Sequence, residues 1–259
     1  MNENFISVVL PCLDEENTVS HCVKQAFLGI KNARIDGEVI VADNGSTDNS
    51  IALAKEEGAV IVNVKSKGYG SALRGGIEAA RGNFIIMGDA DSTYNFEHIE
   101  RFIINLQNGS DLVVGNRFKG GIEKKAMPFL HRIIGNPGLS YIAKKLFNFD
   151  VGDIYCGLRG FTKKAYSQMN LKATGMEFAT EMIVKSSLLK LKITEVPTTL
   201  SKSISPRTPH LNTFRDGLRT LKLLFSYSFI KLFNISFNLV LLLFLPLYIV
   251  ILISSPVNF

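Results

Sequence analysis

Short apolar segments alternate with longer mixed segments along the first part of the chain. The apolar segments predicted as strands are Ile6–Leu10, Glu38–Ala42, Ala59–Val64, Phe84–Gly88 and Asp111–Gly115, and the segments between them predict helices at about residues 15–31, 50–57, 67–80 and 96–107. Strands that alternate with helices favour a mostly parallel sheet with right-handed crossovers. We therefore expect an α/β fold.

Two aspartates directly follow the fourth predicted strand, in Asp89-Ala90-Asp91. The carboxyl ends of strands are the usual place for ligands in an open α/β sheet. Mg²⁺ and Mn²⁺ prefer carboxylate oxygens and are often held jointly by protein and substrate phosphates, so this pair suits a nucleotide diphosphate. The alternative is turn chemistry, because Asp side chains also accept hydrogen bonds from nearby backbone amides.

Three more polar groups follow the earlier strands: Pro11–Glu16, Asp43–Asp48, and Lys67–Gly70 with Arg74. Helix capping or turn formation explains each one alone. Because all of them open toward one edge of the predicted sheet, together they favour a shared ligand site.

The pattern changes after residue 116. We expect helices at Phe129–Phe147 and Glu177–Leu189, and a strand at Lys192–Leu200 that Pro197 restricts to an edge of the sheet. Residues 202–210 contain two prolines and several hydroxyls, which predicts a long loop that could act as a mobile lid.

The C-terminal part favours a membrane. Leu239 to Ile253 is uncharged and almost wholly apolar, and an extension back to Phe229 gives the roughly 20 residues that a spanning helix needs. The segment is either a spanning helix or a deep interfacial one. From residue 202 to 231 there are six basic residues and one acidic residue, which fits an anionic cytoplasmic leaflet better than nucleic acid.

An amphipathic helix is predicted just before this apolar segment. Its apolar stripe can lie in the membrane interface while the basic side chains along one border reach the headgroups. The alternative is a helix packed on the globular domain. The stripe consists of Leu211, Phe214, Leu218, Leu221 and Phe225, and the border of Arg215, Arg219 and Lys222.

The three cysteines, Cys12, Cys22 and Cys156, are scattered and lack metal-ligand spacing. They are typical of reduced thiols rather than of a disulfide framework. We also expect no N-terminal signal peptide, because the chain enters a strand almost at once.

The ordered set of motifs resembles glycosyltransferase family 2, and within it the polyprenyl-phosphate sugar synthases such as dolichyl-phosphate mannose synthase. The resemblance covers about residues 5–205. Two positions depart from it: Asn44 stands where the family often has Asp, and Thr93 where it often has Gln. The motifs are Pro11-x-x-x-Glu15, Asp43–Asp48, Lys67-Gly68-x-Gly70-x-Ala72, Asp89-Ala90-Asp91 and Gly115-Asn116-Arg117.

This resemblance implies a GT-A fold and inverting transfer of a hexose from a nucleotide diphosphate sugar to a polyprenyl or dolichyl phosphate. UDP-glucose, a related UDP-sugar and GDP-mannose all remain open, with a preference for UDP-glucose. It also implies a Mg²⁺ or Mn²⁺ cofactor on Asp89 and Asp91. The implied nucleotide-sugar contacts are Pro11, Leu13, Glu15, Asp43, Lys67, Gly68, Asp89 and Ala90.

A lipid phosphate is already an anionic nucleophile, so its attack needs cationic positioning more than a general base. Arginine suits this role because its planar fork binds phosphate bidentately. The resemblance indicates Arg117, Arg132 and Arg207 as catalytic residues together with Asp91. It also indicates Asn136 at the acceptor phosphate, and a mostly structural segment, Asp153–Phe161, in which Arg159 is a candidate phosphate contact.

The resemblance divides the chain into a catalytic domain (1–205), juxtamembrane amphipathic helices (206–237) and a membrane segment (238–255). Within the domain, residues 1–116 form the nucleotide half and residues 117–205 the acceptor half. We expect membrane localisation with the domain on the cytoplasmic side.

Two alternative functions remain. A polysaccharide synthase would transfer to a sugar hydroxyl and would need a carboxylate base, for which Glu177 and Glu181 are candidates, although we favour a positioning or structural role for them. Such synthases usually carry a Gln-x-x-Arg-Trp motif, and this chain has no tryptophan. The other alternative is a catalytically silent nucleotide-sugar-binding membrane protein.

Overall fold

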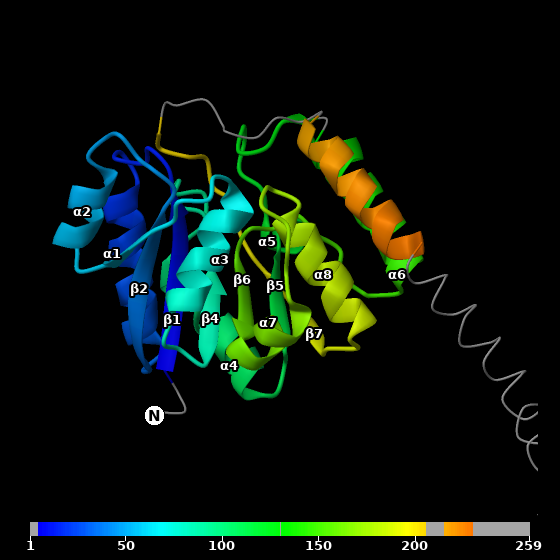
Figure 1. Cartoon of the computed structure of the whole chain (residues 1–259), viewed down its shortest axis with the longest axis horizontal. Helices are drawn as coiled ribbons and strands as arrows, with labels where there is room; N and C mark the ends of the chain where they lie inside the picture. The colour runs from blue at the N-terminus through cyan, green and yellow to red at the C-terminus, as the bar shows by residue number, and fades with distance from the viewer. Residues whose placement is uncertain (1–4, 130, 206–214, 230–259) are drawn as a thin grey trace, which may run out of the picture.

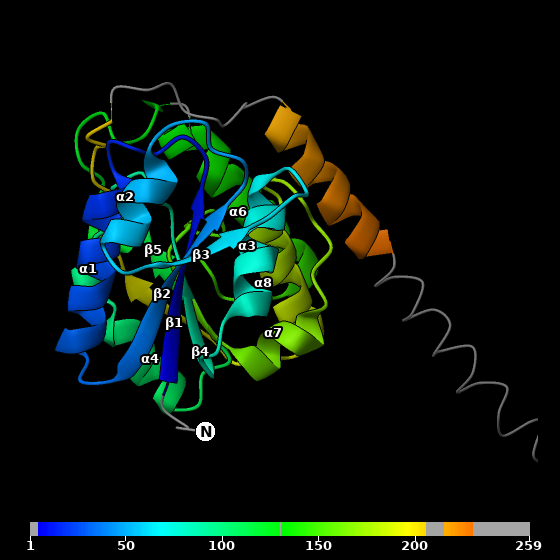
Figure 2. The same cartoon turned by 60° about the vertical axis from the view of Figure 1, so that its left-hand side comes forward.

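The structure, a computed structural model, describes residues 5–129, 131–205 and 215–229 of the chain (Figure 1). A central sheet is covered by helices on both faces. Figure 2 shows α1 (Val19–Asn32) and α4 (Glu100–Gln107) on one side of the sheet, and α3 (Tyr69–Ala79), α7 (Lys163–Met169) and α8 (Phe178–Leu188) on the other. The sequence prediction of an α/β fold is confirmed.

The sheet has seven strands in the order β3-β2-β1-β4-β6-β5-β7, and only β6 runs antiparallel to its neighbours. β1 lies inside the sheet between β2 and β4, and almost all its residues are buried, as expected for a strand covered on both faces. The strands are β1 (Phe5–Cys12), β2 (Asp36–Asp43), β3 (Val60–Asn63), β4 (Phe84–Met87), β5 (Leu112–Asn116), β6 (Arg159–Thr162) and β7 (Ile193–Pro197).

The remaining helical elements connect these strands or cover the outer layer. The helix expected over residues 129–147 is present over residues 131–147, where a π-helix runs directly into an α-helix. Pro137, in the first turn of that α-helix, has no N–H and is tolerated there. These elements are α2 (Ser50–Glu56), η1 (Phe96–His98), α5 (Arg117–Gly120), η2 (His131–Gly135) and α6 (Asn136–Phe147).

One strand of the second half was predicted and one was not. β7 lies at the edge of the sheet, where Pro197 was predicted to place it. β6 was not predicted at all. It has four residues and inserts between β4 and β5. The sheet therefore combines strands from the two predicted halves of the domain, residues 1–116 and 117–205.

Residues 215–229 form a helix that packs against the domain through one face and exposes another. Its packed face includes Asp216, Thr220 and Leu224, all at most 6% exposed. Leu218, Phe225 and Phe229 are 66%, 65% and 73% exposed. The helix is therefore docked on the domain, while Leu218 and Phe225 of the predicted stripe still face outward.

Leu211, Phe214 and the predicted membrane segment 238–255 lie outside the described residues. Within the described part of the chain, no helix combines the length and apolar character needed to cross a bilayer.

A buried carboxylate near the start of β2 ties two segments of the fold together. Glu38, 6% exposed, accepts hydrogen bonds from the Ser7 hydroxyl and the Arg81 backbone N–H at 2.8 Å each, and from Arg81 Nε at 2.8 Å. Burial alone would raise the pKa of Glu38, but these hydrogen bonds and the charge of Arg81 outweigh it and lower the pKa below its usual value of 4.5.

Glu38→Gln should therefore lower the free energy of unfolding by about 1–3 kcal/mol at neutral pH. A carboxylate with a lowered folded-state pKa stabilises the fold above its unfolded pKa, and this contribution is lost as pH falls through the folded pKa. In urea titrations from pH 7 to pH 3, the difference between parent and variant should therefore shrink below about pH 4.5. Glu56→Gln, at an exposed position, is the matched control. A difference that stays constant with pH would contradict this account.

Candidate functional site

The loops after β1 and β2 are joined at the carboxyl edge of the sheet. The parallel register pairs Cys12 with Asp43, so both strands end at the same level. Asp14 Oδ1 accepts the Thr47 backbone N–H at 2.7 Å, and the Asp14 N–H donates to Ser46 Oγ at 3.1 Å. This junction brings the predicted nucleotide residues of the two loops together.

Within this junction the predicted nucleotide residues are mostly enclosed. Pro11 is buried and Leu13 half-buried. Glu15 is 6% exposed; its N–H donates to Ser50 Oγ at 2.7 Å, and its carboxylate accepts the Thr18 hydroxyl at 3.1 Å. Asp43, 7% exposed, accepts the Ser46 N–H at 2.9 Å through Oδ1.

Asn44 connects this junction to the loop before α3. Its side-chain amide donates to the carbonyls of Val64 and Ser66, and its Oδ1 accepts the Gly68 N–H at 2.7 Å. Lys67 Nζ donates to the Asn44 carbonyl at 2.6 Å. An aspartate here could not donate to two carbonyls. The departure from the family pattern at residue 44 therefore has a structural role.

Gly68 and Tyr69 bring this loop to the two aspartates. Gly68 has φ +121°, and a Cβ there would lie 2.3 Å from the Thr174 carbonyl oxygen, so only glycine fits. The next residue, Tyr69, donates its hydroxyl to Asp89 Oδ1 at 2.8 Å. The glycine loop thus positions the first aspartate of the pair.

Asp89 and Asp91 are both half-buried, and Ala90 between them is 1% exposed. Asp91 Oδ1 accepts the backbone N–H and the hydroxyl of Thr93 at 3.0 and 2.6 Å, so Thr93 orients the carboxylate. Within the described part of the chain, Asp91 Oδ2 makes no hydrogen bond. Burial, and then the charge of Asp91, raise the pKa of Asp89 above its ordinary value.

Two oriented carboxylates fit a divalent cation that is shared with substrate phosphates. Among the described residues, no group of three or more His, Cys, Asp or Glu side chains could hold a metal by itself. The pair would therefore need oxygens from the substrate or water to complete the coordination. A bound cation would also favour the charged form of both carboxylates.

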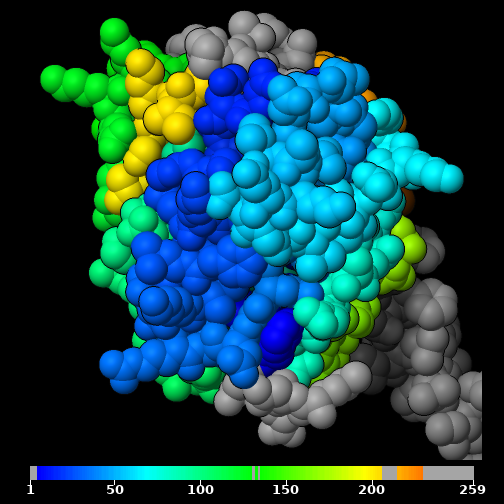
Figure 3. Space-filling model, turned by 90° about the vertical axis from the view of Figure 1, so that its left-hand side faces the viewer, coloured from blue at the N-terminus to red at the C-terminus, as the bar shows by residue number. Residues whose placement is uncertain are grey.

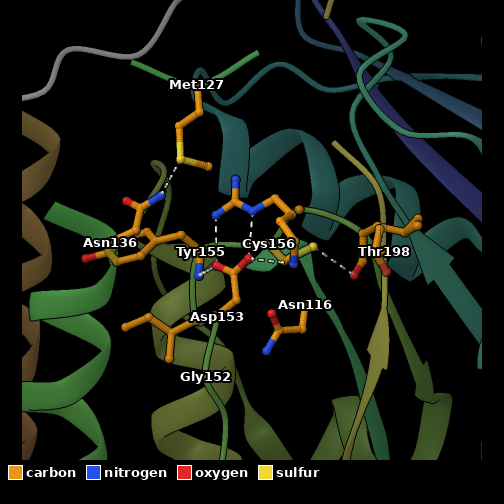
Figure 4. A network of polar contacts seen from close by, with 12 residues as sticks. Asn116, Met127, Asn136, Gly152, Asp153, Tyr155, Cys156 and Thr198 are labelled. Carbon is orange, nitrogen blue, oxygen red and sulfur yellow. Dashed lines mark hydrogen bonds and ion pairs between the residues drawn. The ribbon is translucent and has the colours of Figure 1, made fainter. Parts of the chain in front are cut away.

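Arg117, directly after β5, is held by a buried aspartate (Figure 4). Its Nε and Nη2 donate to Asp153 at 2.7 and 2.8 Å, and Arg117 and Asp153 are 7% and 0% exposed. Within the described residues, the third guanidinium nitrogen, Nη1, makes no hydrogen bond. The segment that carries Asp153 also reaches the aspartate pair, because a Cβ on Gly157 would lie 2.6 Å from Asp89 Oδ2.

Glu195 of β7 supports the segment that carries this ion pair. Its Oε1 accepts from the Asn116 side-chain amide at 3.0 Å and from the backbone N–H of Gly152 and Asp153 at 2.6 and 3.3 Å. The edge strand therefore fixes the segment that carries Asp153. Neither Asp153 nor Glu195 was predicted, because no local spacing shows that they meet Arg117.

Arg159 does not contact the ligand edge. It is 0% exposed and donates to the backbone carbonyls of Cys156, Ile154 and Ala179. The expectation of a phosphate contact at Arg159 was wrong, because its donors are consumed in holding the turn 154–156 against α8.

The other predicted acceptor residues are less enclosed. Arg132 is exposed, and Asn136 at the start of α6 donates to Met127 Sδ at 3.5 Å. In the view of Figure 4, Met127 and Asn136 lie on the opposite side of Asp153 from Asn116. Arg207 lies outside the described residues.

Residues 198–205, which follow β7, lie against the loop that carries Asp91. Ser201 N–H donates to the Thr93 carbonyl at 2.9 Å, Ser203 Oγ to the Asp91 carbonyl at 2.8 Å, and Ile204 N–H to Ser92 Oγ at 3.1 Å. Figure 3 shows this yellow segment at the surface beside the blue N-terminal elements. The residues that follow β7 are therefore bonded to the loop that carries Asp91.

Comparison with known proteins identifies the family. Residues 7–169 match glycosyl transferase family 2. Because the match covers more than half of the chain, the protein belongs to this family, as its motifs predicted.

Similar proteins include the low-salt glycan biosynthesis hexosyltransferase Agl6 of Haloferax volcanii, 37% identical over 84% of this chain and 52% of that protein. The chain thus spans about half the length of this relative. The UDP-N-acetylglucosamine–dolichyl-phosphate N-acetylglucosaminyltransferase of Methanococcus voltae is 29% identical over 76% of this chain and 86% of its own. A dolichyl-phosphate hexose transferase of H. volcanii is 26% identical over 74% and 81%.

Among solved structures, glucosyl-3-phosphoglycerate synthase from Mycobacterium tuberculosis has a similar fold. It aligns with a TM-score of 0.66 and 20% identity over 87% of this chain and 80% of its own. That structure contains Mn²⁺, UDP and glucosyl-3-phosphoglycerate. The alignment confirms the GT-A fold for this chain.

Asp153→Asn should destabilise the protein by about 3–5 kcal/mol, because it leaves the buried Arg117 without a counter-charge. The free energy of unfolding from urea titration at neutral pH measures this loss. The matched control is Asp150→Asn, because Asp150 has a side chain that is 94% exposed and pairs with Lys144 at the surface. The control should change stability little, because solvent screens an exposed ion pair. Equal losses in the two variants would show that the Arg117–Asp153 pair does not stabilise the site.

Proposed function

We propose that the protein is an inverting glycosyltransferase. It transfers a hexose from a nucleotide diphosphate sugar, UDP-glucose or a related UDP-sugar or GDP-mannose, to a polyprenyl or dolichyl phosphate at the cytoplasmic face of a membrane. The observation that carries this proposal is an arginine with an unbonded guanidinium nitrogen, held by Asp153 in a segment that also packs against Asp89 through Gly157.

On the donor side, the joined loops after β1, β2 and β3 bind the nucleotide, with Pro11, Leu13, Glu15, Asp43, Lys67 and Gly68 as its contacts. Asp89 and Asp91 would hold a Mg²⁺ or Mn²⁺ ion. When bound, this ion neutralises the charge that develops on the leaving diphosphate. Thr93 and Tyr69 keep the two carboxylates oriented toward it. The fold neighbour that contains Mn²⁺ and UDP supports this assignment.

On the acceptor side, Arg117 is preorganised for a phosphate because Asp153 fixes its plane and leaves Nη1 available. Arg132, Asn136 and Arg207 complete the acceptor-phosphate site. A phosphate oxygen attacks the anomeric carbon from the face opposite the nucleotide, a carbon–oxygen bond forms, and the bond to the diphosphate breaks with inversion. No proton has to be removed from the nucleophile.

Glu181 on α8, one of the two candidate bases, is engaged elsewhere, which favours a phosphate over a hydroxyl acceptor. Glu181, 2% exposed, accepts four contacts from backbone and side chains. Glu177, directly before α8, accepts the Gly175 N–H through Oε1, and its Oε2 is buried without a hydrogen-bond partner among the described residues. The dolichyl-phosphate transferases among the relatives point to the same acceptor class.

Membrane attachment uses two parts of the C-terminal region. The helix 215–229 places Leu218, Phe225 and Phe229 on one exposed face, with Lys222 among them. Such a face can enter the lipid interface while the opposite face stays docked on the domain. The apolar residues from Leu239 to Ile253 then anchor the chain.

The test of this function is a transfer assay with a panel of nucleotide sugars, a short polyprenyl phosphate and Mn²⁺. We expect a sugar phosphodiester on the lipid, loss of product in excess chelator, and at least about a hundredfold lower rate for Asp91→Ala, because a lost electrostatic contact to the reacting group typically costs this much. The surface change Asp150→Ala serves as the control.

Transfer to a sugar hydroxyl but never to the lipid phosphate would identify a polysaccharide synthase instead. Nucleotide-sugar binding without any transfer would identify a catalytically silent protein. Full activity in excess chelator would remove the metal from the proposal.

A second prediction concerns the membrane-facing helix. The parent should bind vesicles that contain anionic lipid more strongly than neutral ones, and this preference should fall with added salt. Lys222→Glu should reduce the preference by about tenfold, because each basic residue near the surface contributes about 1 kcal/mol. Lys31→Glu, at an exposed position of α1, is the control. An apolar anchor strengthens binding to anionic and to neutral vesicles alike, so it does not change the ratio of the two affinities. If Lys222→Glu leaves this ratio unchanged, the exposed face of the helix does not meet the headgroups.

A further inference from the structure

A buried carboxylate on α8 joins the helix 215–229 to the loop 172–175. Glu181 Oε2 accepts the backbone N–H groups of Lys172 and Ala173 at 2.8 Å each. Its Oε1 accepts the Tyr227 hydroxyl at 2.8 Å and pairs with Lys185 at 3.2 Å. Glu181 therefore connects two segments that lie far apart in the sequence.

The loop 172–175 in turn packs on the glycine loop of the nucleotide side. The Thr174 carbonyl accepts the Ser71 N–H at 3.2 Å. A Cβ on Gly68 would lie 2.3 Å from that carbonyl oxygen, and a Cβ on Gly70 would lie 2.6 Å from the Ala173 carbonyl oxygen. The backbones of the two loops are thus in direct contact, and a shift of one loop requires a shift of the other.

The glycine loop carries Tyr69, whose hydroxyl donates to Asp89. A continuous set of contacts therefore runs from Tyr227 through Glu181 and the loop 172–175 to Tyr69 and the metal-binding pair. Figure 2 shows the helix 215–229 in orange on the outer side of the molecule, with α3 and α8 between it and the sheet.

The contact between this helix and the domain combines apolar side chains such as Leu224 with buried hydroxyls. Thr220 of the helix is 2% exposed, and Thr180 precedes Glu181 on α8. Tyr155 Oη and Thr180 Oγ1 are buried and have no hydrogen-bond partner among the described residues. Buried polar atoms without partners are costly, so this contact is weaker than an apolar one of the same size. The Tyr227–Glu181 hydrogen bond and the contact of Lys185 with the Tyr227 ring attach the helix to α8.

We propose that Glu181 is a positioning residue that couples docking of the helix 215–229 to binding of the donor nucleotide. When the helix is docked, Tyr227 and Glu181 hold the loop 172–175 against Gly68 and Gly70, and Tyr69 stays on Asp89. Each event then favours the other, because coupling between two binding equilibria is reciprocal. The coupling ties donor binding to the part of the chain that meets the membrane, and it rests on the proposed function.

The test compares the parent with Tyr227→Phe, which keeps the ring but removes the hydroxyl. Calorimetry of UDP and of GDP with Mn²⁺ gives the affinity, and hydrogen exchange of amides 215–229 with and without nucleotide reports docking. We expect nucleotide to slow exchange across these amides in the parent. In Tyr227→Phe this slowing should be lost. Nucleotide binding should be about three- to tenfold weaker, near the lower end of the factors by which one site usually changes the affinity of another.

The matched control is Tyr141→Phe, because Tyr141 is 62% exposed on α6 and its hydroxyl makes no hydrogen bond within the described part of the chain. This variant should behave as the parent does. Glu181→Gln is a second variant, and it should weaken nucleotide binding in the same direction. A purely structural role would lower the melting temperature of Tyr227→Phe and leave its nucleotide affinity unchanged.

Equal affinity in the parent and Tyr227→Phe, or exchange of 215–229 that nucleotide does not affect in the parent, would overturn the coupling and leave the proposed function intact. A parent that binds neither nucleotide would overturn both.

Discussion

The site depends on the parallel pairing of β1 with β2 on one side and β4 on the other. This register sets Cys12 level with Asp43 and Val9 level with Met87, so the chain leaves all three strands at one edge of the sheet. Each loop that begins there is bonded to the next: Asp14 to Thr47, Asn44 to Gly68, and Tyr69 to Asp89. The donor side is thus preorganised by hydrogen bonds of the protein itself, as a rigid binding site requires.

Much of this arrangement could be predicted from sequence because it follows from local patterns. Apolar segments predicted the five parallel strands β1 to β5, Pro197 predicted the edge position of β7, and the polar groups after each strand predicted where the site lies. The family resemblance then added roles to those residues. Which of them contact the substrates is still a prediction, because it depends on the bound ligands.

The parts that could not be predicted depend on contacts between distant residues. β6 has only four residues and begins with Arg159, so its sequence does not look like that of a buried strand. The pairing of Arg117 with Asp153 and the role of Glu195 required the fold, because these residues are separated by 36 and 42 positions. For the same reason, sequence periodicity found the apolar stripe of the helix 215–229 but could not show that the opposite face is docked on α8.

The central claim is that the strand ends bind a nucleoside diphosphate through a metal held by Asp89 and Asp91. The most direct measurement compares calorimetric affinities for UDP and UMP, and for GDP and GMP, with Mn²⁺ and with chelator. A metal shared with the second phosphate should make binding of the diphosphates at least about tenfold tighter in Mn²⁺ than in chelator, which corresponds to about 1.4 kcal/mol. Binding of the monophosphates should change little. Diphosphate affinity that is the same with Mn²⁺ and with chelator would contradict the claim.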